Sequence, residues 1–241
     1  MPTITFQPIN DIASELLEPP KPAAGFVPEW YRKMPPYIED DTTAGISVGN
    51  NSQPNTTAKG CSPFLDALTA GYVWAAPADI EVRRKDDNYM FRWRTEGDFV
   101  TAHSPNPHPG RPAMQDGGDW VMKWAFHFKI ITPEGYSTLF THPHNRHDLP
   151  FRTFTGIVDT DSYQLAVQFP FQFSNTVIEN DDIYIIEKGT PLCQMTPFKR
   201  DEWVSEEAEL DLADTRKSVF DFRTKIVRSY KSQFWTRKVF S

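Results

Sequence analysis

A mostly β protein of the α+β class is what this sequence predicts, because two stretches alternate strictly and a late segment changes period. Residues 88–94 (NYMFRWR) and 120–131 (WVMKWAFHFKII) alternate apolar with polar or smaller side chains, as half-buried strands do. A turn signal at 133–135 then predicts that residues 120–141 form one long hairpin. Further along, apolar residues recur at helical spacing, which predicts a helix over about 211–232.

Two more segments predict strands. In residues 155–173 (TGIVDTDSYQLAVQFPFQF), a turn precedes apolar residues that alternate from Leu165 to Phe171. Residues 182–198 (DIYIIEKGTPLCQMTPF) predict two strands joined at Lys188 and Gly189, with Gly189 at positive φ. The large aromatic residues lie on apolar strand faces and are expected to pack in the core rather than to stack on bases: Trp93, Trp120, Trp124, Phe126 and Phe128.

Three segments are expected along the chain. Residues 1–60 form a Pro-rich N-terminal arm without a sustained helical or strand period, residues 61–200 a β domain, and residues 201–241 a C-terminal helical segment. Several aromatic residues lie in the arm between positions 26 and 37. We therefore expect the arm to lie against its own domain or a neighbouring subunit.

Composition limits the classes of partner. The 241 residues are 39% hydrophobic, enough to bury a core, and the net charge of −7 makes nucleic acid an unfavourable partner. No apolar run has the length of a membrane span, and the first residues lack the pattern of a signal peptide. We expect a cytoplasmic protein, or a virion-associated one if a phage encodes it, with Cys61 and Cys193 as reduced thiols.

A histidine cluster is the first candidate site. His142, His144 and His147 fall within six residues, and neutral imidazoles are common ligands of divalent metals. The alternative interpretation is a polar loop in which these histidines and Arg146 bond to backbone carbonyls, because Pro143 opposes a regular strand. His127 is expected to be a surface histidine with satisfied hydrogen bonds.

Two aspartates form the second candidate. Asp159 and Asp161 follow a short apolar run, so either could orient a water molecule or a ribose hydroxyl as part of a rigid site. Turn capping by Asx hydrogen bonds is the alternative. The corner at Gly189 is a third candidate, in which backbone amides and Gln194 would face a ligand.

Three stretches, taken in order, resemble the motif series of the trimeric dUTPase and dCTP deaminase superfamily, whose fold is the β-clip. TAGYVWAAPADIEV (69–82), TGIVDTDSY (155–163) and EKGTPLCQM (187–195) are similar to its first, Gly-Val-Ile-Asp-x-Asp-Tyr and Gly-Asp-Arg-Ile-Ala-Gln-Leu motifs. The resemblance covers about residues 64–199. It implies a jelly-roll-like barrel, a trimer, and a nucleotide ligand.

The same resemblance implies roles for individual residues. Asp159 would activate water, with Asp161 beside it, Tyr163 would stack on a sugar, and Gln194 would lie near phosphates. Several positions depart from the motifs: Val73 replaces an aspartate, Thr190 and Pro191 replace an Asp-Arg pair, and Tyr163 falls one position late. The Arg-Ser-Gly phosphate motif is absent, with Arg146 as its only candidate equivalent, and no Gly-rich arm ends the chain.

Three functional hypotheses follow. The whole chain also resembles uncharacterised phage and bacterial proteins of about this length, which share patterns such as HPHNRHDLPF and KGTPLCQMTPFKRDEW. We favour a non-catalytic or diverged β-clip protein that acts through oligomeric assembly, a phage structural partner, or binding of a small ligand such as a nucleotide. The alternatives are a nucleotide hydrolase or deaminase that uses Asp159, and a cupin-like enzyme with a divalent metal on the histidine cluster.

Overall fold

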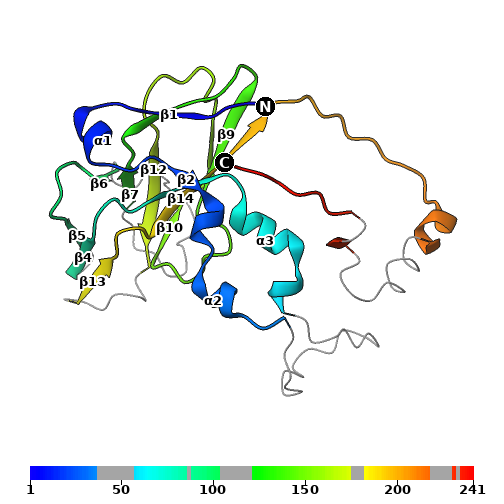
Figure 1. Ribbon diagram of the computed structural model, residues 1–241, viewed down its shortest axis with the longest axis horizontal. Coiled ribbons are helices and arrows are strands. Elements are labelled where there is room, and N and C mark those ends of the chain that lie inside the picture. Colours follow the sequence, from blue (N-terminus) through cyan, green and yellow to red (C-terminus); the bar gives the residue numbers. More distant parts are fainter. Residues whose placement is uncertain (37–56, 86–87, 104–120, 175–181, 218–229, 232–233) are drawn as a thin grey trace. The chain divides into compact units, whose positions relative to one another are not determined.

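The computed structural model describes residues 1–36, 57–85, 88–103, 121–174, 182–217, 230–231 and 234–241 (Figure 1). Contacts divide these residues into two compact units. The larger unit comprises residues 1–26, 69–200 and 240–241, and the smaller comprises residues 27–68 and 201–239. The division into a 1–60 arm, a 61–200 domain and a 201–241 segment stays a prediction.

The larger unit contains every strand that the structure describes, which confirms the mostly β prediction. The strands are β1 (Thr5–Pro8), β2 (Lys21–Pro22), β3 (Tyr72–Ala75), β4 (Ile80–Lys85), β5 (Asn88–Arg92), β6 (Val100–Ala102), β7 (Met122–Ala125), β8 (Phe128–Ile131), β9 (Tyr136–Thr141), β10 (Phe151–Thr153), β11 (Gly156–Val158), β12 (Gln168–Phe173), β13 (Ile183–Ile186) and β14 (Pro191–Lys199). The short helix α1 (Asp11–Glu15) and the 3-10 turn η1 (Ala23–Phe26) belong to the same unit.

Four antiparallel sheets arise from these strands. Their orders are β1-β8, β10-β12-β7-β6, β11-β9-β14-β3-β2 and β13-β4-β5. Strand β14 is central in the five-stranded sheet, where it pairs with β3 on one side and β9 on the other. Within the N-terminal segment, β1 pairs with β8 and β2 with β3, so strands form where the sequence shows no strand period. This part of the predicted arm lies against the chain's own sheets.

The long hairpin predicted for residues 120–141 is wrong. The alternation continues through two strands, β7 and β8, but β7 pairs with β6 and β12 whereas β8 pairs with β1. Strand β9, the expected partner, pairs with β11 and β14 instead. Both β7 and β8 turn the same alternate residues inward, so their sequence pattern conceals the change of sheet.

His127, between β7 and β8, is buried rather than on the surface. Its Nε2 lies 2.7 Å from the carbonyl oxygen of Asp98, and its backbone carbonyl accepts from Ile9 N–H at 3.1 Å. The hydrogen bonds of His127 are therefore satisfied, as expected, and the residue lies where the chain passes from one sheet to another.

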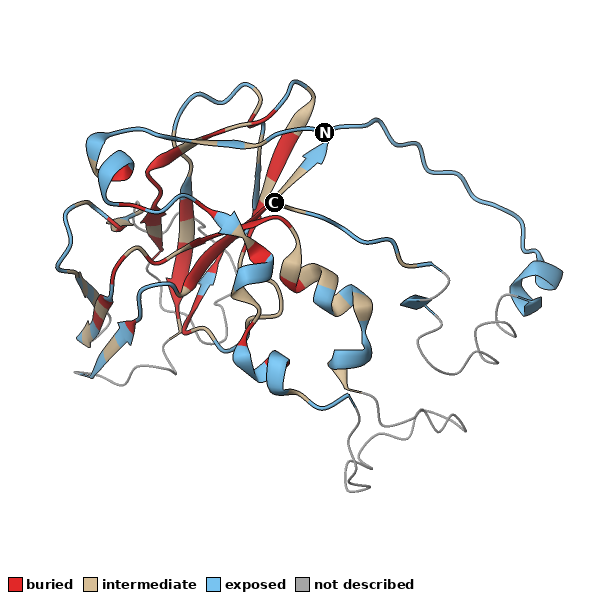
Figure 2. Cartoon of the chain, in the orientation of Figure 1, coloured by how far each residue is buried: buried red, intermediate tan, exposed pale blue. Residues whose placement is uncertain are grey.

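Aromatic packing dominates the core, as predicted. Trp124 and Phe171 stack with ring centroids 3.5 Å apart, and Trp74 meets Phe126 edge to face at 5.3 Å. Burial is concentrated on the strands of the larger unit (Figure 2). Trp93 is only partly buried, and Trp120 lies outside the described residues. The aromatic residues expected in the core therefore pack there wherever they are described, with Trp93 at its margin.

The structure also bears on the corner predicted at Gly189 and on the strand predicted from Leu165. Gly189 has φ +87° between β13 and β14, as expected, although these strands belong to different sheets. The strand predicted from Leu165 begins only at Gln168, and Leu165 is exposed, because the preceding turn extends through Tyr163.

The smaller unit contains α2 (Glu29–Lys33), the 3-10 turn η3 (Ala58–Gly60) and α3 (Ser62–Thr69), whose last residue counts with the larger unit. Tyr31 of α2 stacks on Phe64 of α3, and the Lys59 ammonium donates to the carbonyl oxygens of Tyr31 and Arg32. Of the helix predicted over 211–232, residues 212–217 are helical, while 218–229 lie outside the described residues. No helix in the described ranges has the length and apolar character needed to cross a membrane.

Candidate functional site

A hollow of about 670 Å³ gathers the predicted histidines and Arg146. It is formed by the end of β9, the loop that follows it, strand β10 and the end of β12. We call it the His–Arg pocket, and its lining is Thr141, His142, Pro143, His144, Asn145, Arg146, His147, Leu149, Phe151, Arg152, Thr153, Thr155, Gln172, Phe173 and Ser174. Its volume falls in the range of small-molecule sites.

No carboxylate occurs in this lining, although the chain as a whole is acidic. The pocket carries two arginines and three histidines together with hydroxyl and amide side chains. Arg146 is neutralised by Asp148, whose carboxylate accepts from Nε and Nη2 at 2.8 and 2.9 Å. Arg152 forms no ion pair with any residue that the structure describes. The pocket therefore offers an uncompensated positive charge.

The positive surroundings also act on His142. Burial is the largest cause that lowers the pKa of this imidazole from 6.5 to about 4, and the nearby Arg152, His147 and Arg146 contribute to the decrease, whereas the hydrogen bond to the Arg146 carbonyl opposes it. His142 is consequently neutral at pH 7. Burial likewise lowers the pKa of His144.

The loop that carries the histidines is held by its own hydrogen bonds. Arg146 N–H donates to the Pro143 carbonyl at 3.2 Å, and Asn145 takes the left-handed conformation at φ 57°, which asparagine tolerates better than most residues. His142 Nε2 donates to the Arg146 carbonyl at 2.9 Å, while its Nδ1 accepts from Thr153 N–H at 3.3 Å. Both ring nitrogens are thus committed to backbone groups.

The alternative interpretation of the histidine cluster therefore describes His142, which bonds to a backbone carbonyl. Within the described part of the chain, no three His, Cys, Asp or Glu side chains are grouped so that they could hold a metal ion. Metal binding by His142, His144 and His147 stays a prediction, and this geometry gives it no support.

Gln194 fixes the same loop from β14. Its Oε1 accepts from His144 N–H at 2.8 Å, and its Nε2 donates to the Ala70 carbonyl at 2.7 Å. The side chain is buried. Gln194, expected to lie near phosphates, is in this structure a link between three backbone segments.

Asp159 and Asp161 lie at a different place, where β11 ends near the start of β9 and the end of β14. Asp161 pairs with Arg200 and accepts from Gly135 N–H at 2.9 Å. Asp159 accepts from the Ser137 hydroxyl at 2.6 Å and from Arg200 at 3.3 Å. The ion pair with Arg200 and the Gly135 amide lower the pKa of Asp161 from 3.8 to about 2, against partial burial, which raises it.

The two aspartates thus form an ionic cluster that joins three strand ends. Arg200 was missed by the sequence analysis, because a lone arginine some 40 positions away gives no local signal of its partner. Tyr163 is partly exposed in the turn after Asp159, where its N–H donates to the Asp159 carbonyl at 2.9 Å. It does not lie on a strand face.

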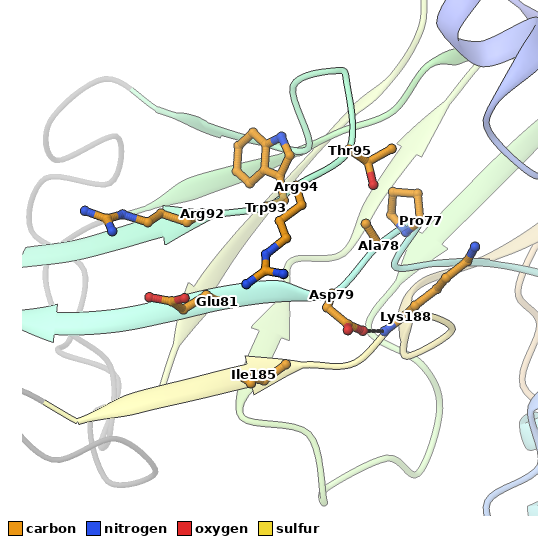
Figure 3. Close-up of a pocket in the computed structure, with 10 residues that line it drawn as sticks. All are labelled: Pro77, Ala78, Asp79, Glu81, Arg92, Trp93, Arg94, Thr95, Ile185 and Lys188. Atoms are coloured by element: carbon orange, nitrogen blue, oxygen red, sulfur yellow. Dashed lines mark hydrogen bonds between the residues drawn. The ribbon is translucent and has the colours of Figure 1, made fainter.

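A second hollow, of about 710 Å³, lies on the outer side of the three-stranded sheet (Figure 3). Figure 3 shows Asp79 beside Lys188 and Arg94 extending above Glu81. The Asp79 carboxylate accepts a hydrogen bond from the backbone N–H of Lys188 at 2.7 Å. This hollow is lined by both acidic and basic side chains, whereas the lining of the His–Arg pocket contains no acidic one. A third hollow, of about 410 Å³, is lined by Arg146, residues 148–150 and residues 184–191. Asp159 lines none of these three.

Acid should destabilise the fold between pH 6.5 and about 4 through His142. Its pKa is lower in the folded protein, so in this window the unfolded chain binds a proton that the folded chain excludes. We expect the melting temperature to fall from pH 7 to pH 4 and to fall less in His142→Asn. His144 acts in the same direction, whereas Asp161 acts only between pH 3.8 and about 2. An identical slope in His142→Asn would contradict this assignment.

No protein-family model matches the chain, and no curated protein matches it. Among solved structures, it is similar to the dUTPase of phage phi11 of S. aureus, at 12% identity and a TM-score of 0.36, over 88% of this chain and 99% of that one. A mutant of the same dUTPase, with a coordinated structural Mg(II) ion, gives 15% identity and a TM-score of 0.31 over 60% of this chain and 86% of that one. Both TM-scores are below 0.5, so the β-clip topology stays a prediction.

Proposed function

We propose that this protein binds a small anionic ligand, of the nucleotide class, in the His–Arg pocket and does not use Asp159 for catalysis. The observation that carries the proposal is the composition of the lining, which holds the Arg152 guanidinium and no carboxylate in a chain of net charge −7. A protein with a uniform acidic surface would repel such a ligand. The lining of the His–Arg pocket differs from this overall charge, because it contains arginines and no acidic side chain.

The size and the walls of the pocket suit a small organic anion. Phe151 and Phe173 supply buried apolar surface, and Thr155, Ser174 and Asn145 supply hydrogen-bonding groups. A nucleotide has matching parts in its base, sugar and phosphate. The nucleotide class itself rests on the motif resemblance, which also implies the trimeric assembly that we include in the proposal.

The environment of Asp159 favours a structural role. A general base needs a carboxylate directed at a water molecule next to bound substrate. Asp159 instead accepts hydrogen bonds from Ser137 and Arg200 and lines none of the three hollows described above. The Arg200 cluster therefore supports a binding protein over a hydrolase.

Reversing the charge of Arg152 should weaken binding at least tenfold. Titration calorimetry with dUMP, dUTP and ATP would measure the affinity of the wild type and of Arg152→Glu, and ionic strength should affect the wild type more. Arg83→Glu is a matched control, since Arg83 is exposed on β4 and lines none of the hollows. Its affinity should equal that of the wild type, and light scattering on the same samples gives the oligomeric mass.

Asp159→Asn separates binding from hydrolysis. We expect it to bind the same nucleotides with unchanged affinity, and wild-type protein to release neither pyrophosphate nor phosphate from dUTP. Release of pyrophosphate that disappears in Asp159→Asn would establish the hydrolase alternative. Failure of the wild type to bind any of the three nucleotides would overturn the proposal.

A further inference from the structure

Thr141, at the end of β9, carries an unpaired polar atom in the His–Arg pocket. Its Oγ1 is buried and is the one buried side-chain nitrogen or oxygen without a hydrogen-bond partner among the residues that the structure describes. The residue is 9% exposed and belongs to the lining of the pocket. Buried hydroxyls nearly always have a partner, because leaving one unpaired costs the free energy of its lost hydration.

Neighbouring threonines show that this strand does satisfy its hydroxyls elsewhere. Thr138, on the same strand and fully buried, has its Oγ1 2.9 Å from the Oγ1 of Thr160. Thr153, which also lines the pocket, donates to the Leu192 carbonyl at 2.6 Å. Among the described residues the unpaired buried hydroxyl is therefore that of one threonine, and this threonine belongs to the lining of the pocket.

The depth of Thr141 suggests what reaches it. Thr141 is buried, whereas Arg152 and His147 of the same lining are exposed and lie toward solvent. A ligand group that reaches Thr141 would share the pocket with the Arg152 guanidinium and would have to present an acceptor to the hydroxyl. A tetrahedral phosphoryl group has several oxygens, so one can accept from Thr141 while others face positive charge.

We propose that Thr141 is a specificity-determining residue whose hydroxyl donates to a phosphoryl oxygen of the bound ligand. This inference rests on the proposed function of the His–Arg pocket and adds the ligand's phosphoryl group and the residue that selects it. The hydroxyl is then unpaired in the free protein because the ligand supplies its hydrogen-bond acceptor on binding.

The test pairs affinity with stability. Calorimetry with inorganic phosphate and with dUMP, and melting without ligand, would compare the wild type with Thr141→Val, Thr141→Ser and Thr138→Val. Thr141→Val should bind both probes at least tenfold more weakly, while its melting temperature without ligand stays equal or rises, since it loses an unpaired hydroxyl. Thr141→Ser, which keeps the hydroxyl, should recover affinity to within about threefold of the wild type.

Thr138→Val is the matched control, because it removes a paired hydroxyl from the same strand. It should lower the melting temperature and leave the affinity unchanged. If Thr141→Val binds like the wild type, or if it loses stability as Thr138→Val does, the inference about Thr141 is wrong. In that case a loss of affinity in Arg152→Glu would still support the proposed function. No binding of phosphate or dUMP to the wild type would overturn the inference about Thr141, and no binding of dUTP or ATP in addition would overturn the proposed function as well.

Discussion

Replacing Gly71 by alanine should lower the free energy of unfolding by more than about 4 kcal/mol, an exceptional loss for one methyl group. Gly71 precedes β3 with φ +68°, a conformation that costs an alanine about 1 to 2 kcal/mol. An added Cβ would also overlap the carbonyl oxygen of Met195 on β14 and lie 2.9 Å from its carbonyl carbon. Both obstacles are backbone, so no side-chain rearrangement relieves them.

Urea unfolding of Gly71→Ala and Gly25→Ala would measure the effect. Gly25 lies in η1 at negative φ, and its added Cβ would meet nothing within 4 Å. We expect this control to change stability by no more than about 0.5 kcal/mol. A Gly71→Ala protein within 1 kcal/mol of the wild type would show that β3 and β14 can separate at this point.

The contact at Gly71 explains why two of the motif-like stretches have the residues they have. The stretch at 69–82 supplies Ala70 and Gly71, and the stretch at 187–195 supplies Gln194 and Met195. In the structure Gln194 bonds to Ala70, and Gly71 lies against Met195, across the β3–β14 pair. In this chain the pattern therefore corresponds to close approach of two strands, which is a property of the fold rather than of the chemistry.

Strands were predictable to the extent that alternation reflects burial on one face. Residues 88–94 and 183–198 gave strands in the expected places, although the first five residues of β14 are buried on both faces. The pairing was not predictable, since the period of two is identical whichever strand lies alongside, and β7 and β8 belong to different sheets. The strands β1 and β2 show no alternation in the sequence, because they are only 4 and 2 residues long and are largely exposed.

The candidate site was predictable in its ionisable residues and not in its geometry. A local cluster such as His142 to His147 is visible in sequence, and the structure keeps it together in one pocket. Arg152 and Thr141 have ordinary surroundings in the sequence, and their importance depends on what fails to contact them. Only the packed structure shows which side chains lack a partner, and only the structure shows that Arg200 pairs with Asp161.

Replacing Gln194 by leucine should cost about 3 kcal/mol, because the Ala70 carbonyl and the His144 N–H would each lose a partner in a partly buried place. Leucine fills a similar volume, so the loss reports the two hydrogen bonds rather than a cavity. Gln168→Leu is the matched control. Gln168 is exposed on β12, and its replacement should change stability by less than about 0.5 kcal/mol.

Gln194→Glu tests the hydrogen bond that the amide donates to the Ala70 carbonyl. Glutamate keeps an oxygen to accept from His144 N–H, but at neutral pH it directs a second oxygen at the Ala70 carbonyl, where the wild type has a donor. Protonation restores that donor, so the folded-state pKa of the new carboxyl is raised, and the stability gap to the wild type should narrow as the pH falls from 7 to 5. A gap that is constant over this range would mean that the side chain at position 194 makes no hydrogen bond to the Ala70 carbonyl. Nucleotide affinity should decrease in Gln194→Leu as well, because the loop bearing His144 would lose its attachment to β14.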